Sequence, residues 1–164
     1  MTDFYGVENH GPYEIFDLGD FPLEEGGVIR GCKLAYAAFG HLSAAKDNAI
    51  LVTTWYSGTS KIMEKVFIGP GRSLDPESYF IIVVNQLGNG ISSSPHNFPA
   101  PASGPRFPRV RIGDDVRAQH RLITEKFGIE RERAESKADA CHYSSSTVSK
   151  SAGRMTSRTS QSPE

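Results

Sequence analysis

The chain has 164 residues with hydrophobic and charged fractions of 38% and 23%, which are ordinary for a single globular domain. Its formal net charge of -1 leaves no basic surplus for a phosphate backbone, so we expect no nucleic-acid partner. No apolar run approaches the roughly 18 residues of a membrane span, and the first residues lack the basic and apolar pattern of a secretory signal. We therefore expect a cytoplasmic protein without a membrane partner.

The spacing of the cysteines and histidines predicts neither a disulfide framework nor a metal site. Cys32 and Cys141 lie far apart in the sequence and form no C-x-x-C motif, which favours free thiols in a reducing compartment over a bridge. No group of Cys, His or Asp residues has the spacing of metal ligands. We expect no metal and no bound cofactor.

The first elements predicted along the chain are two antiparallel strands. Apolar and polar residues alternate in "YEIFDLGDF", residues 13–21, and again in "KLAYAAFG", residues 33–40. Alternation of this kind is typical of strands with one solvated face. The next segment, "HLSAAKDN", has the composition of a turn.

Two continuous apolar runs follow, at residues 49–54 and 79–85, and both are rich in β-branched side chains. Such runs are typical of strands buried on both faces of a parallel sheet. Several Gly and Pro residues between positions 69 and 76 require any helix between the two runs to be short. Residues 87–108 then form a Gly-, Pro- and Ser-rich loop, and a structureless loop of this length usually carries function.

A helix is predicted next, capped by Gly113 or Asp114 and ended by Gly128. Its expected apolar stripe consists of Val116, Ile123 and Phe127, flanked by Ala118 and Leu122.

The polar residues of this helix have structural explanations. Asp114 and Asp115 complement the helix dipole, which we favour over a catalytic pair of carboxylates. His120 lies on or beside the stripe and is expected to pack there. A solvated face is predicted for the i,i+4 neighbours Arg117, Arg121 and Glu125.

Four segments resemble, in order and spacing, the homoserine O-acetyltransferase family within the α/β-hydrolase fold: "ILVTTWYSGTS", "IGPGRSLDPESYFIIVVNQLGNGISSSP", "GPRFPRV" and "DDVRAQHRLITEKFGIER". The similarity covers roughly residues 13–131. It implies an α/β fold, a mostly parallel sheet with helices on both faces, which here is truncated before the nucleophile elbow. Residues 1–130 would be a partial α/β-hydrolase core.

The resemblance ends at Glu132, where the family continues with a strand and a Gly-x-Ser-Met-Gly elbow. The chain contains no G-x-S-x-G motif, and "KSAGR", residues 150–154, follows no predicted strand. About a third of residues 131–164 are Ser or Thr, so we expect a disordered tail that is not homologous to the family. A shifted reading frame, a retained intron and a faulty gene model all stay open as its origin.

The resemblance implies that this chain contains one half of the family's active site. The backbone N–H of Tyr56 would be one oxyanion donor, and Ser57 and Gly58 occupy the same turn. The alternative is that these residues form a tight turn with no catalytic role. Trp55 is either a pocket wall or a packed aromatic, and Gly88 and Gly90 either let backbone approach a substrate or only serve a turn.

Two hypotheses for function follow. In the first, the chain is a truncated and inactive member of a family that transfers an acyl group to a hydroxyl or hydrolyses esters with a Ser-His-Asp triad. Acyl-CoA would be the co-substrate and a small-molecule acyl acceptor the partner of the intact family, and a homodimer is open only to the full-length protein. In the second hypothesis, the chain is a non-catalytic binding or interaction protein built on half a hydrolase sheet.

Overall fold

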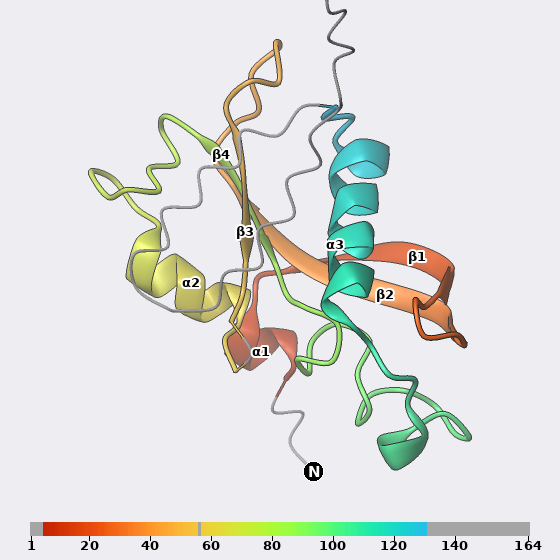
Figure 1. The fold of residues 1–164 in the computed structure, drawn as a ribbon. Helices are drawn as coiled ribbons and strands as arrows, with labels where there is room; N and C mark the ends of the chain where they lie inside the picture. The colour runs from red at the N-terminus through yellow and green to blue at the C-terminus, as the bar shows by residue number, and fades with distance from the viewer. Residues whose placement is uncertain (1–4, 56, 131–164) are drawn as a thin grey trace, which may run out of the picture.

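The computed structural model describes residues 5–55 and 57–130 (Figure 1). Within them lie four strands and three α-helices: α1 (Val7–His10), β1 (Glu14–Pro22), β2 (Val28–Phe39), β3 (Ala49–Thr53), α2 (Ser60–Phe67), β4 (Phe80–Val84) and α3 (Ile112–Arg121). A 3-10 turn spans Gly104–Arg106, and a π-helical turn, Leu122–Lys126, continues α3. Tyr56, Cys141 and the predicted tail, residues 131–164, lie outside the described residues.

The strands form one mixed sheet in the order β1-β2-β4-β3. β1 and β2 pair antiparallel, which confirms the predicted pairing, although β2 begins at Val28, five residues before the predicted segment. β4 pairs antiparallel with β2 and parallel with β3, in the register that places Leu51 opposite Ile82. The predicted parallel pair of apolar strands is therefore confirmed.

The prediction of burial on both faces holds for β4 and is wrong for β3. All five residues of β4 are buried, whereas β3 has four partly buried residues and an exposed Thr53. The difference follows from position, because β4 lies between two strands and β3 has one neighbour among the described strands.

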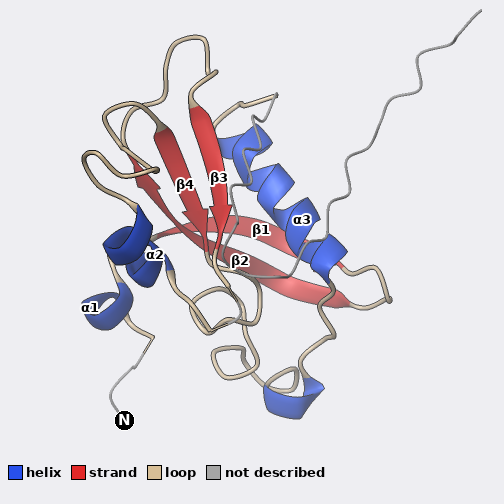
Figure 2. Cartoon of the chain, turned by 60° about the vertical axis from the view of Figure 1, so that its left-hand side comes forward, coloured by secondary structure: helices blue, strands red, loops and turns tan. Residues whose placement is uncertain are grey.

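Side chains of β4 alternate between two hydrophobic clusters. Ile82 and Val84 pack into the cluster that includes Leu122 of the π-helical turn, and Ile81 and Val83 into the cluster that includes Met63 of α2. Figure 2 shows α2 and α3 on opposite faces of the sheet. Each fully buried Ile or Val contributes roughly 1.5–3 kcal/mol through removal of apolar surface from water, so β4 is the centre of the fold.

The N-terminus of α3 differs from the prediction. The N-cap residue is Arg111, not Gly113 or Asp114. Asp114 lies three residues into the helix, where its carboxylate accepts the backbone N–H of Arg111 at 2.8 Å, as the acidic residue of a capping box does. The predicted end of the helix is confirmed, because Gly128 has a left-handed φ of 60°.

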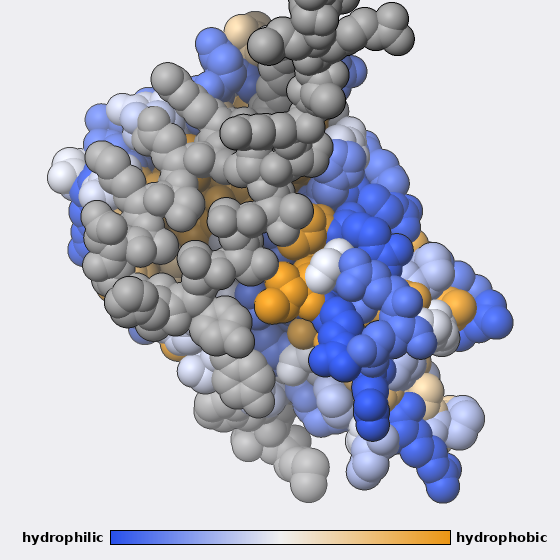
Figure 3. Space-filling view, viewed as in Figure 1, coloured by the Kyte–Doolittle hydropathy of each residue, from blue (hydrophilic) through white to orange (hydrophobic). Residues whose placement is uncertain are grey.

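The buried face of α3 also differs from the predicted stripe. Val116 is 58% exposed, whereas Ala118, Leu122 and Ile123 are buried. Val116 and Ile123 are seven residues apart and would share a face of an uninterrupted α-helix. Val116 lies two residues, about 200° around a regular helix, from the buried Ala118, so it is exposed before the π-helical turn begins, whereas Ile123 lies within that turn and is buried. In Figure 3 apolar surface appears beside the hydrophilic surface of α3, and the exposed apolar side chains of that helix are Ile112 and Val116.

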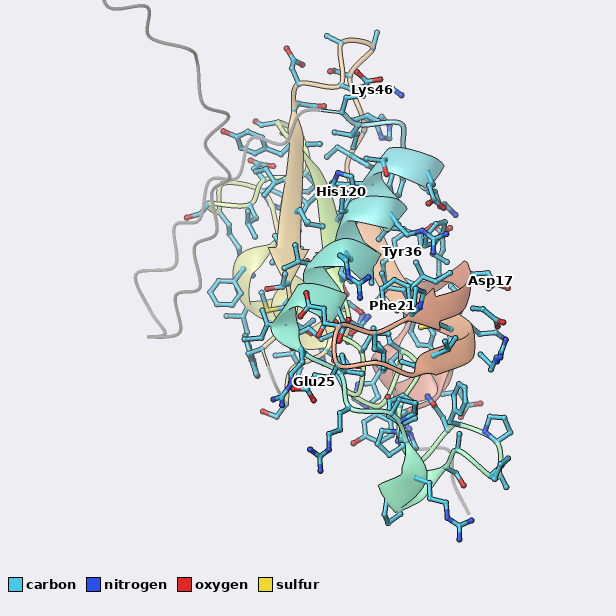
Figure 4. All side chains as sticks on the ribbon, turned by 45° about the vertical axis from the view of Figure 1, so that its right-hand side comes forward. Asp17, Phe21, Glu25, Tyr36, Lys46 and His120 are labelled. Atoms are coloured by element: carbon cyan, nitrogen blue, oxygen red, sulfur yellow. The ribbon has the colours of Figure 1, made fainter. Side chains whose placement is uncertain are left out.

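One polar side chain of α3, His120, departs from its prediction, and another, Arg117, is exposed as predicted but also makes tertiary contacts. His120 is exposed, so it does not pack into the core as expected (Figure 4). Arg117 donates to the buried carboxylate of Asp114 and to the carbonyl of Pro22, and its guanidinium lies 5.2 Å from the centre of the Phe21 ring. It therefore joins α3 to β1. The predicted i,i+4 pair of Arg121 and Glu125 is confirmed at 2.6 Å.

Candidate active site

The carboxyl ends of β3 and β4 lie at the same end of the sheet because the two strands are parallel (Figure 2). Residues 54–59 leave β3 at this end and enter α2, and the loop that begins at Asn85 leaves β4. Ligands of open α/β sheets bind at this end. The described candidates, Trp55, Ser57, Gly58, Gly88 and Gly90, all belong to these two segments.

Trp55 and Gly58 are in close contact. The N–H of Gly58 donates to the carbonyl of Trp55 at 3.0 Å. A Cβ atom at Gly58 would lie 2.7 Å from Cε2 and Nε1 of Trp55, so the indole occupies the space of a side chain. Trp55 also meets Phe67 edge-on and is 41% exposed, so it packs on one side and faces solvent on the other. Ser57 is exposed, and Tyr56, the candidate oxyanion donor, lies between described residues.

Asn85 fixes this turn against the central strand. Its Oδ1 accepts the backbone N–H of Ser60 at 2.9 Å, and its Nδ2 donates to Ser60 Oγ at 3.1 Å and to the carbonyl of Ala35 at 3.3 Å. The N–H of Thr54 donates to the carbonyl of Val84 at 3.0 Å. Asn85 was not among the predicted site residues. The sequence feature that could have indicated it is a polar amide directly after the apolar run of β4.

The loop after β4 is irregular but fixed in place. Ser92 Oγ accepts the N–H of Ala35 at 2.8 Å and donates to the carbonyl of Asn85 at 2.6 Å. Ser93 Oγ accepts the N–H of Lys33 at 2.9 Å, and the N–H of Ser93 donates to the carbonyl of Lys33 at the same distance. Residues 91–94 are buried. The loop therefore pairs with β2 through hydroxyl groups and backbone, which a periodicity search cannot detect.

The two glycines of this loop have left-handed φ angles, 85° at Gly88 and 110° at Gly90. Gly88 is exposed, and its N–H donates to the carbonyl of Ser93 at 2.9 Å. Gly90 is buried, and a Cβ atom there would lie 2.5 Å from the ring of Tyr5. Both glycines thus serve turn geometry, and the approach of a substrate to Gly88 stays a prediction.

The adjacent acids of α3 are in different environments. Burial would raise the pKa of Asp114, but the N–H groups of Arg111 and Glu24 and the guanidinium of Arg117 hold it below its usual range. Burial raises the pKa of Asp115 to about 6, although its carboxylate accepts the N–H of Leu87 at 2.8 Å. Asp114 therefore ties α3 to the β1–β2 connection, and Asp115 ties α3 to the loop after β4. These contacts are more specific than the predicted dipole effect.

The thiol of Cys32 is not a nucleophile at neutral pH. Cys32 is free and fully buried, and burial raises its pKa to about 11, so it stays protonated. Within residues 5–55 and 57–130 no three His, Cys, Asp or Glu side chains are grouped as a metal site. None of the described helices is long and apolar enough to cross a membrane.

Known proteins with similar sequences are esterases and acyltransferases. The chain is 60% identical over 130 residues to an ethyl acetate hydrolase of Pseudomonas veronii and 54% identical over 129 residues to a probable esterase of Corynebacterium glutamicum. These matches cover 79% and 78% of this chain but 37% of each relative. A homoserine O-acetyltransferase of Thermobifida fusca is 37% identical over 123 residues, which are 66% of this chain and 32% of that protein. No family model matches the chain.

Solved structures agree with these sequence matches. The acetyl esterase MekB superposes with a TM-score of 0.75 at 61% identity, over 77% of this chain and 36% of that one. An acetylester hydrolase from Corynebacterium glutamicum gives a TM-score of 0.74 at 54% identity, with the same coverage. The chain is thus a homologue of the esterases and homoserine O-acetyltransferases of the α/β-hydrolase fold, and it spans a little over a third of the length of its esterase relatives.

Proposed function

We propose that this chain supplies the oxyanion side of a carboxylic-ester hydrolase. The observation that carries this proposal is the turn between β3 and α2, which Asn85 fixes against β4. In α/β-hydrolases the loop between the corresponding strand and helix provides one of the two backbone donors of the oxyanion hole. Tyr56 N–H is our candidate for this donor, with Trp55 and Ser57 beside the acyl group.

The chemistry of such a site is acyl transfer through a serine. The serine oxygen attacks the ester carbon, and the carbonyl oxygen takes up negative charge that the two N–H groups stabilise. The alcohol then leaves, and water releases the carboxylic acid from the acyl-enzyme. The 164 residues contain no G-x-S-x-G motif that could place this serine. We therefore propose that the chain is catalytically inactive by itself.

Short acetate esters are the substrate class that we favour. The two most similar relatives reported above are named an ethyl acetate hydrolase and a probable esterase and share 60% and 54% identity, against 37% for the homoserine O-acetyltransferase. The acyl acceptor would be water, so acyl-CoA would not be required as a co-substrate. We propose a cytoplasmic location, because Cys32 is a free, buried thiol.

A chimaera tests this function. Residues 5–130 would replace the matched 130-residue region of the Pseudomonas veronii ethyl acetate hydrolase. We expect the chimaera to hydrolyse ethyl acetate and to transfer no acetyl group from acetyl-CoA to homoserine. The control is the 164-residue chain alone, which should give neither a burst nor turnover with an activated acetate ester.

Two outcomes would contradict the proposal. Turnover by the chain alone that a serine-directed phosphonate abolishes would show that it contains its own nucleophile. A chimaera that folds but does not hydrolyse esters would show that the turn is not a working half of the site, and would favour the binding-protein hypothesis.

A further inference from the structure

The N-terminal segment, residues 5–11, reaches the candidate active site. Figure 2 shows α1 at the end of the sheet where the arrowheads of β3 and β4 lie. The Tyr5 ring lies over the backbone of Gly90, where it fills the space of a side chain. It also lies 4.8 Å, between ring centres, from His96 of the same loop. The segment is therefore docked on the loop that follows β4.

His10 extends this contact to the turn. Its Nδ1 lies 3.2 Å from Oγ1 of Thr59, and its ring stacks on Tyr5 with an interplanar angle of 24°. Thr59 is the N-cap residue of α2 and is 4% exposed. The contact joins two segments that are 49 residues apart in the sequence.

Thr59 departs from the usual behaviour of an N-cap residue. A threonine at this position normally accepts a backbone N–H from the first turn of its helix. Here the side chain of Thr59 makes no capping hydrogen bond, and its hydroxyl pairs with His10 instead. The first N–H of α2, that of Ser60, is bound by Asn85. The helix start is thus held by two side chains from outside it, that of Asn85, directly after β4, and that of His10 in the N-terminal segment.

We propose that His10 is a positioning residue for the oxyanion turn. Donors that stabilise an oxyanion act only if they are held in place before the reaction. His10 holds Thr59 and Asn85 holds Ser60, the two residues through which the turn enters α2. This role rests on the proposed function, in which that backbone binds the oxyanion. It assigns to the N-terminal segment a part in catalysis that the sheet alone does not supply.

Amide hydrogen exchange in the 164-residue chain tests the contact without any catalysis. His10→Leu and Thr59→Val should each accelerate exchange at Gly58 and Ser60 by about fivefold to tenfold, the effect of one lost hydrogen bond. The double variant should be no faster than either single variant, because both remove the same contact. Thr59→Ser keeps the hydroxyl and should exchange as the wild type does.

His96→Leu is the matched control, because His96 contacts Tyr5 and its replacement leaves the His10–Thr59 pair in place. It should leave exchange at Gly58 and Ser60 unchanged. Equal acceleration in His96→Leu and His10→Leu would overturn the proposal, since it would show only that the segment must be docked. Additive effects of His10→Leu and Thr59→Val, or no effect of either, would also overturn it.

The chimaera described above gives the catalytic readout. There His10→Leu should lower kcat on the order of tenfold and leave KM nearly unchanged, since the turn acts on the charge that develops in the transition state. A rise in KM with unchanged kcat would contradict the positioning role. An inactive chimaera counts against the proposed function, whereas unchanged exchange at Gly58 and Ser60 counts against the role of His10, so the two failures are distinguishable.

Discussion

The side-chain oxygen of Asn85, at the end of β4, accepts the backbone N–H of Ser60, the first residue of α2, at a distance of 2.9 Å. Asn85 is fully buried and Ser60 is 1% exposed. The first N–H groups of a helix have no partner within the helix, and the N-cap side chain of Thr59 does not provide one. Asn85 therefore satisfies a buried donor and sets where α2 begins relative to the central strand.

Replacing Asn85 by Leu should lower the free energy of unfolding by on the order of 3 kcal/mol, because two buried polar groups of Ser60 lose their partner. Urea denaturation of the wild type and the variant measures this loss. The neighbouring partly buried Gln86, changed to Ala, is the control and should cost less than about 1 kcal/mol. Equal costs for the two variants would show that Asn85 only fills space.

Asp115 makes stability depend on pH in a direction that is unusual for a carboxylate. Burial raises its pKa from 3.8 to about 6, so between these values the folded state binds more protons than the unfolded state. The contribution of Asp115 to the free energy of unfolding therefore falls as the pH rises from about 4 to above 6. At neutral pH the buried charge of Asp115 lowers the free energy of unfolding by about 3 kcal/mol, since one pKa unit corresponds to 1.36 kcal/mol.

Asp115→Asn should remove this dependence while keeping an acceptor for the N–H of Leu87. The variant should match the wild type near pH 4 and be more stable than the wild type at pH 7, as measured by thermal unfolding across this range. Glu77→Gln, an exposed change before β4, is the control and should leave the pH profile as it is. A constant difference between Asp115→Asn and the wild type at all pH values would contradict the prediction.

The strands could be predicted from sequence because burial imposes a period on them. Alternation in β1 and the unbroken apolar run of β4 each reflect how many faces are covered, and both strands were placed within about a residue of their bounds. The end of α3 was predictable for a similar local reason, since Gly128 adopts a conformation that favours glycine.

The contacts that build the site were not predictable, because they join residues distant in sequence. Asn85 lies 25 residues from Ser60, and His10 lies 49 residues from Thr59. Neither the spacing nor the composition of the sequence predicts such pairs. The predicted stripe of α3 was wrong for a different reason. Val116 lies on the side of the regular helix away from the buried Ala118, and Ile123 belongs to the π-helical turn, where the α-helical repeat no longer holds.

The corrected phase of α3 has a measurable consequence. Ile123→Ala should lower the free energy of unfolding by about 2–5 kcal/mol, because Ile123 is 2% exposed and packs in the main hydrophobic cluster. Val116→Ala should cost less than about 1 kcal/mol, because Val116 is 58% exposed. Chemical denaturation of both variants decides between the observed buried face and the predicted stripe, in which the two costs would be similar.

We expect the contributions of Lys46 and Gly128 to the free energy of unfolding to be coupled. Lys46 Nζ donates to the carbonyls of Phe127 and Gly128 at 2.8 and 2.9 Å, and so satisfies groups at the end of the π-helical turn (Figure 4). A Cβ atom at Gly128 would lie 2.6 Å from that same Nζ. Gly128→Ala should therefore displace Lys46 as well as strain the backbone.

A double-mutant cycle separates these two effects. Gly128→Ala should cost roughly 1–2 kcal/mol for the left-handed backbone, plus about 1 kcal/mol for the displaced hydrogen bonds of Lys46. In a Lys46→Met background the second contribution is already lost, so the same change should cost only the first. Urea unfolding of the four proteins measures the coupling, which we expect near 1 kcal/mol. Strictly additive costs would show that the lysine can move aside without loss, and that Gly128 is required for its backbone conformation alone.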